Sequence, residues 1–170
     1  MKKFHRRFSP LKSKLDGFNL MSVTQAKWND EQCRVEDGIF FPDDSVMLLS
    51  GNPRAGCAAS APIELSLLLE ADPEGWTELM EHLACRVEAG GIIATAGGGA
   101  WEGDGFVAAL RASDGALLWV LHLAGAGAFS ELRHDGDIIE AISSEWPDEY
   151  RWRIPLGSPS ELSVIANRAS

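Results

Sequence analysis

Hydrophobic and polar residues follow two different periods in the middle of the chain. From Ile63 to Leu69 every second residue is apolar, and this alternation predicts a β-strand with one buried face over residues 63–70. Over residues 73–90 the apolar residues recur at three- and four-residue spacings, which predicts one amphipathic helix. Asp72 is placed to cap this helix, and Gly90-Gly91 to end it. The apolar face of the predicted helix comprises Trp76, Leu79, Met80, Leu83 and Val87.

The second half of the chain predicts an antiparallel meander. Its apolar segments are separated by turn signals such as Asp135-Gly136, a dipeptide typical of tight hairpins. Residues 117–121 are apolar throughout, as expected of a central strand that is covered on both faces. The predicted strands are residues 106–111, 116–123, 129–134, 137–144, 150–154 and 162–165.

These elements together predict the fold class and the domain organisation. We expect an α+β fold, in which an antiparallel β-meander sheet of five to six strands packs with one main amphipathic helix. Two further short strands are predicted at 38–41 and 46–49, followed by a loop over 51–62. The chain has 170 residues and is 45% hydrophobic, so residues 21–170 suffice for a single domain.

The charge is distributed unevenly and restricts the classes of partner. The chain has 15 Lys and Arg against 25 Asp and Glu, a net charge of −10. Six of the basic residues lie in the first fourteen positions, which leaves nine bases against 25 acids, a net charge of −16, for residues 15–170. A body this acidic repels nucleic-acid phosphates and anionic membranes and attracts basic protein surfaces. We therefore expect a basic protein partner, no nucleic acid and no membrane.

The basic segment 1–20 allows three interpretations. It could be a presequence or nucleic-acid-binding tail, a docking arm, or a flexible extension ahead of the folded part. A docking arm would make the protein an adaptor domain that is held through this tail. Met21 could also be the natural start, so that residues 1–20 would not belong to the native chain. The segment lacks the apolar run of a secretory signal.

The three cysteines lie far apart and show no metal-binding spacing. An odd number of widely spaced cysteines fits reduced thiols, so Cys33, Cys57 and Cys85 favour a cytoplasmic protein. His122 and His134 lie on consecutive predicted strands whose hairpin would not place them opposite each other. The glycine-rich residues 96–105 lack the Lys-Ser/Thr of a phosphate loop and predict a flexible connection. We expect no metal and no cofactor.

Two groups of acidic residues leave an enzymatic alternative open. Asp43-Asp44 and the carboxylates within residues 145–149 could serve acid–base or divalent-cation chemistry in a small enzyme. Acidic residues are also common in turns, where solvent carries their charge at little cost. No nucleophile motif accompanies them, so the sequence supports no particular reaction.

The six tryptophans suggest a binding surface. Trp28, Trp101 and Trp146 fall in predicted loops beside acidic residues. Aromatic anchors combined with carboxylates are typical of surfaces that bind basic proteins, although rings in such places also cover the edges of sheets. The candidate partner-binding residues are Trp101, Glu102, Asp104, Glu145, Trp146, Asp148 and Glu149.

Three segments of the second half resemble a class of bacterial proteins. The segments are Leu117–Phe129, Ile142–Pro147 and Trp152–Leu156. In strand composition they resemble small acidic bacterial immunity proteins of secreted or contact-delivered toxin systems. The resemblance implies an inhibitor that neutralises a cognate protein toxin by occluding its active site. It carries over no functional residue and leaves the oligomeric state open.

Overall fold

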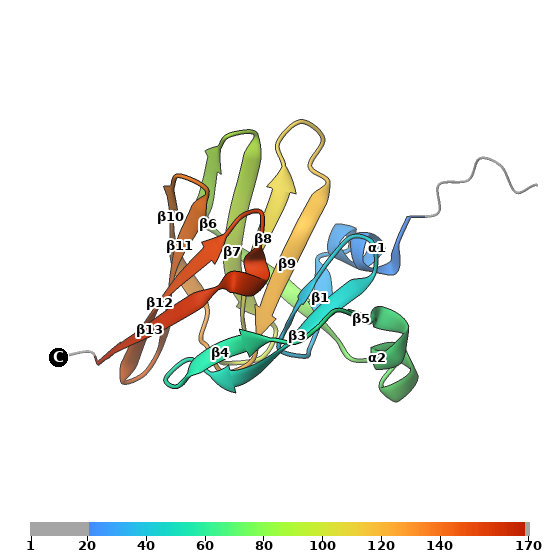
Figure 1. Cartoon of the computed structure of the whole chain (residues 1–170), viewed down its shortest axis with the longest axis horizontal. Coiled ribbons are helices and arrows are strands. Elements are labelled where there is room, and N and C mark those ends of the chain that lie inside the picture. The colour runs from blue at the N-terminus through green and yellow to red at the C-terminus, as the bar shows by residue number, and fades with distance from the viewer. Residues whose placement is uncertain (1–20, 169–170) are drawn as a thin grey trace, which may run out of the picture.

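β-strands dominate the structure and pair into two antiparallel sheets (Figure 1). The computed structural model describes residues 21–168, except for the side chains of 82–84 and 168. The elements that precede the first long strand are α1 (Val23–Asn29), β1 (Gln32–Arg34), β2 (Gly38–Phe40), β3 (Ser45–Asn52), β4 (Gly56–Ala59), β5 (Ile63–Glu64) and α2 (Leu65–Ala71). The elements that follow are β6 (Trp76–Ala89), β7 (Ile92–Gly99), β8 (Gly105–Arg111), β9 (Leu117–Leu123), β10 (Phe129–Asp135), β11 (Ile138–Glu145), β12 (Asp148–Pro155), the 3-10 helix η1 (Pro159–Glu161) and β13 (Ser163–Arg168).

The predicted meander is divided between the two sheets. The larger sheet has nine strands in the order β1-β6-β7-β8-β9-β2-β3-β4, with β5 beside β3. The smaller sheet follows the chain from β10 to β13. After β9 the chain leaves the larger sheet, and β2 takes the place beside β9 through pairs such as Ile39 with Leu121. All six strands predicted for the second half are therefore confirmed, but the single sheet of five to six strands is wrong.

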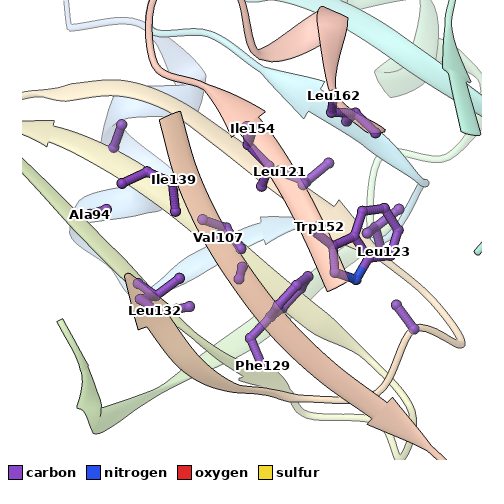
Figure 2. Close-up of a cluster of buried hydrophobic side chains, with 14 of the residues drawn as sticks. Ala94, Val107, Leu121, Leu123, Phe129, Leu132, Ile139, Trp152, Ile154 and Leu162 are labelled. Atoms are coloured by element: carbon purple, nitrogen blue, oxygen red, sulfur yellow. The ribbon is translucent and has the colours of Figure 1, made fainter. Parts of the chain in front are cut away.

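The first core lies between the two sheets (Figure 2). Val107 and Leu121 of the larger sheet pack against Phe129 and Trp152 of the smaller one. The Trp152 ring is fully buried and meets the Phe129 ring edge-on, with their centroids 5.9 Å apart. Its indole Nε1 donates a hydrogen bond to Oγ of Ser143 at 3.1 Å, so the polar atom of this large side chain is also satisfied.

The second core lies on the opposite face of the larger sheet. There α1, β1 and α2 cover side chains such as Phe106 and Val120, and Leu65 of α2 is buried among them. Strands β8 and β9 are therefore buried on both faces, which confirms the prediction for residues 117–121. No helix in the described part of the chain has the length and apolar character needed to cross a membrane.

The main amphipathic helix predicted over residues 73–90 is wrong, because this segment is the long strand β6. Its pairing with β7 shifts between Glu81 and Arg86, so that residues 82–85 face a single residue of β7. This bulge changes the phase of the strand's two-residue alternation. The helix-like spacing mixes residues from both faces of the strand, since Leu79 is buried and Met80 exposed before the bulge, and Val87 follows only after the change of phase.

The strand predicted over residues 63–70 is wrong beyond Glu64, where the chain forms α2. Leu65 is buried and Leu68 and Leu69 are half-buried, at the i, i+3, i+4 spacing of a helix face, whereas Leu67 is exposed. Asp72 is the C-cap of this helix, not the N-cap of the next one. The fold class is therefore mostly β with two short α-helices, and not α+β.

Two further predictions concern the glycine-rich segment and the N-terminus. Residues 96–99 are not a flexible connection but the buried end of β7, and only 100–104 form a loop. The basic tail 1–20 lies outside the described residues.

Candidate functional site

Four chain segments meet at one end of the two packed sheets (Figure 1). Antiparallel hairpins place alternate turns at opposite ends of a sheet. The amide of Gly127 donates a hydrogen bond to the carbonyl oxygen of Gly103 at 2.8 Å. A Cβ added at Gly127 would lie only 2.0 Å from the carbonyl oxygen of Ser144, so the backbones are in direct contact. We call this region the loop end; it consists of residues 53–55, 100–104, 124–128 and 144–149.

The loop end brings together most of the predicted partner-binding residues. Trp101 is 70% exposed and Trp146 is 90% exposed, although both are large apolar side chains. Glu102 and Glu145 are exposed beside them, and Glu149 is half-buried. Oε2 of Glu145 lies 3.8 Å from the point where a Cβ of Gly103 would stand, which places this carboxylate at the Trp101 loop. Residues more than 40 positions apart thus form one acidic, aromatic surface.

Asp104 belongs to the same loop but turns inward. Its side chain is 8% exposed, and its Oδ2 lies 3.6 Å from Nε2 of the fully buried His122. The backbone amide of Asp104 donates a hydrogen bond to the carbonyl oxygen of Trp101 at 3.1 Å, which closes the loop. In this position Asp104 fixes the loop that carries Trp101 and does not present its carboxylate to solvent.

Asp148 is likewise buried, at 6% exposure, and forms an ion pair with Arg54 from the β3–β4 turn. The hydroxyl of Tyr150 donates to the same carboxylate oxygen at 3.4 Å. Hydrogen bonding to Tyr150 and Asp148 raises the pKa of Arg54. The pair fastens the β3–β4 hairpin to the smaller sheet. Sequence reasoning missed Arg54, because nothing in the local pattern links it to a residue 94 positions away.

The two acidic groups of the enzymatic alternative lie at opposite ends of β3. Asp44, beside the first residue of β3, accepts hydrogen bonds from the amides of Val23 at 3.0 Å and Thr24 at 2.8 Å at the start of α1. Asp148 contacts Arg54, two residues after the end of β3, and the eight extended residues of β3 span about 25 Å. Among the side chains that the structure describes, no three His, Cys, Asp or Glu residues lie close enough together to hold a metal ion.

Trp28 lies in α1 and not in the predicted loop. Its ring lines a cavity of about 370 Å³ together with side chains of β6 and β8. Sequence reasoning missed this cavity, because it assigned the β6 residues to a helix. The lining residues are Trp28, Glu31, Leu79, Met80, Glu81 and Phe106.

Comparison of the chain with protein-family models, with curated proteins and with solved structures gave no match. The relation to immunity proteins therefore stays a prediction, which rests on strand composition. Function has to follow from the geometry and the charge of the chain itself.

Proposed function

We propose that this protein binds a basic protein through the loop end and inhibits it, as an immunity protein that occludes the active site of a cognate toxin. The observation that carries the proposal is the exposure of two indole rings, Trp101 and Trp146, on adjoining loops. An exposed indole contributes little to the core, and tryptophan is among the residues that contribute most binding energy at protein interfaces. Two exposed indoles on adjoining loops favour a role in binding.

The charge of the chain supports a basic partner. Glu102 and Glu145 are exposed and each is the chain neighbour of one of the two tryptophans, and residues 15–170 carry a net charge of −16. Carboxylates around an aromatic anchor accelerate association with a basic surface and disfavour acidic partners. An enzyme that acts on phosphates has a basic active site, so a nuclease-like toxin would offer the matching surface. The proposal includes a cytoplasmic location, with which the free thiols of Cys33, Cys57 and Cys85 agree.

The test is capture of the partner by the immobilised full chain from extracts of the native host, with mass spectrometry of the retained protein. We expect one basic protein in stoichiometric amount. The loop-end variant, which carries Trp101→Ala, Trp146→Ala, Glu102→Lys and Glu145→Lys, should not retain this protein. The matched control carries Glu70→Lys and Glu88→Lys, two charge reversals at exposed positions outside the loop end.

Three outcomes decide between the alternatives. Equal retention of the partner by the loop-end variant and the control would overturn the proposal. Loss of binding on removal of residues 1–20 alone would favour the adaptor interpretation. The retained protein should also be toxic when expressed alone, and the unaltered chain, but not the loop-end variant, should relieve this toxicity. Thermal denaturation of the loop-end variant should match that of the unaltered chain, since both indoles are largely exposed.

A further inference from the structure

A groove separates α1 from β6 on the face of the larger sheet that is turned away from the smaller sheet. We use the name "the groove" for the cavity of about 370 Å³ lined by the six residues given above. Its volume lies within the range of ordinary small-ligand sites.

The floor of the groove is aromatic. The rings of Trp28 and Phe106 meet edge-on, with their centroids 6.2 Å apart and their planes at 68°. Phe106 and Leu79 are buried in the second core, whereas the side chain of Met80, which alternates with Leu79 along β6, is 57% exposed on the opposite face of the strand. This surface offers an incoming group an apolar contact on rings that are already packed and therefore need not move.

Two carboxylates line the same space. Glu31 follows α1 with a left-handed φ of 59°, and its carbonyl oxygen accepts a hydrogen bond from the amide of Leu79 at 2.8 Å, which fixes it beside β6. Among the described side chains, none forms a hydrogen bond or ion pair with the Glu31 carboxylate. Glu81 accepts a hydrogen bond from the Thr95 hydroxyl and forms a solvent-exposed ion pair with Arg86 at 3.3 Å.

We propose that the groove binds an arginine side chain of the basic partner, with the guanidinium beside Glu31 and Glu81 and its methylene groups on the ring of Trp28. The two carboxylates disfavour an anion, and a neutral apolar ligand would desolvate them without compensation. A cation on an apolar stem meets both the rings and the charges. Arginine suits the site better than lysine, because its planar guanidinium donates to two carboxylates at once.

The groove adjoins the loop end. Leu79 pairs with Gly99, the last residue of β7, and the Trp101 loop begins at the next residue. A partner seated on Trp101 therefore has the groove within reach of its neighbouring side chains. The identity of the arginine donor rests on the proposed function, whereas the preference of the groove for a guanidinium is measurable without any partner.

The first experiment is an NMR titration of the full chain with N-acetylarginine amide and, in parallel, with N-acetylcitrulline amide, which replaces the guanidinium by an uncharged urea of similar shape. We expect saturable shifts of the Trp28 indole signal and of the amides of residues 79–81 with the arginine compound. The citrulline compound should bind at least about tenfold more weakly. Equal affinities, or no shift of these signals, would overturn the proposal.

The second experiment uses variants of the groove. Glu31→Gln should raise the dissociation constant of N-acetylarginine amide about threefold, and Glu31→Gln with Glu81→Gln about tenfold. Glu88→Gln, an exposed residue of the same strand outside the groove, should leave it unchanged and is the matched control. Glu31→Gln is the decisive variant, because the Glu81 carboxylate also accepts from Thr95. An unchanged affinity in Glu31→Gln would refute the role of the carboxylates.

The two proposals fail in distinguishable ways. The variant Trp101→Ala with Trp146→Ala should bind N-acetylarginine amide as the unaltered chain does. If the groove prefers arginine but the loop-end variant still retains the captured protein, the proposed function fails and the groove stands. If the arginine compound does not bind while the loop-end variant loses the captured protein, the groove fails and the proposed function stands.

Discussion

Gly97 of β7 occupies a position where no side chain fits. A Cβ added there would lie 1.9 Å from the carbonyl oxygen of Met80 on β6 and 3.0 Å from Cε1 of Phe106. Real Cβ atoms essentially never approach another heavy atom within 3.0 Å, so Gly97→Ala forces β6 and β7 apart by about 1 Å. The carbonyl oxygen belongs to the backbone of a paired strand and cannot rotate away, as a side chain could.

This displacement sets the size of the effect. Overpacking in a buried region costs about 1–3 kcal/mol, and a backbone obstacle places Gly97→Ala at the upper end, at about 3 kcal/mol. A domain of this size unfolds with about 5–15 kcal/mol, so the loss is a large fraction of the total. At roughly 2–4 °C per kcal/mol, the melting temperature should fall by about 6–12 °C.

Urea denaturation followed by tryptophan fluorescence measures this loss within a graded series. Gly98→Ala should cost less, about 1 kcal/mol, because its Cβ would lie 3.2 Å from the Cβ of Ala128 and 3.5 Å, an ordinary contact distance, from the carbonyl oxygen of Asp104. Gly157→Ala should be neutral or slightly stabilising, because nothing lies within 4 Å of its added Cβ. If Gly97→Ala stays within about 0.5 kcal/mol of the unaltered chain, the close pairing of β6 with β7 is refuted.

Three other substitutions test the cores and the helix that borders the groove. Asp44→Ala should lower stability by about 1 kcal/mol and weaken arginine binding at Trp28, because it removes the acceptor for the first amides of α1; calorimetry measures both. Ser143→Ala leaves the buried indole N–H of Trp152 without its acceptor and should cost about 1–2 kcal/mol; an unchanged urea midpoint would contradict this. Burial raises the pKa of the Cys33 thiol above its ordinary 9.0, so the stability that this buried thiol contributes is complete below that pH and declines above it; the difference between the urea midpoints at about pH 8 and pH 10 should be smaller in Cys33→Ala than in the unaltered chain.

Local turn chemistry explains why the strands of the second half were predictable. A tight hairpin turn forms where Asp135-Gly136 predicts one, and the strands on both sides follow from it. Its two loop residues are Gly136, at a φ of 64°, and Asp137, one position later than predicted, because Asp135 pairs with Ile138. The choice of sheet has no such local signal. β9 pairs with β2, about 80 residues earlier in the chain, and this pairing sends β10 to the other sheet.

The elements in the middle of the chain were predicted wrongly, because the apolar residues there fit both the two-residue period of a strand and the 3.6-residue period of a helix. In β6, Thr77 and Leu79 are buried while Glu78 and Met80 are exposed, which is the alternation of a strand. The bulge after Glu81 hides this alternation when the segment is read as one pattern. In α2 the error was the reverse, because the alternation of apolar residues predicted a strand where the chain forms a helix. The segment consists of Leu, Ser, Glu and Ala without β-branched residues, a composition that favours a helix.

The candidate site was predictable in its exposed part only. Trp101 and Trp146 lie beside acidic residues in turns, and such positions are usually exposed. The inward orientation of Asp104 and Asp148 depends on His122 and Arg54, which reach them from other strands and turns. Pairings between distant positions leave no trace in the local sequence pattern.

The loop end and the groove should contribute differently to the kinetics of partner binding. Glu102 is an exposed residue of the loop end, so its charge acts mainly before the partner makes contact and should set the association rate. Glu31 lines the groove and would meet the partner only after docking, so Glu31→Gln should mainly raise the dissociation rate. Surface plasmon resonance with the captured partner at two salt concentrations separates the rates. If Glu31→Gln slows association and leaves dissociation unchanged, its carboxylate acts only by steering and the arginine is not seated in the groove.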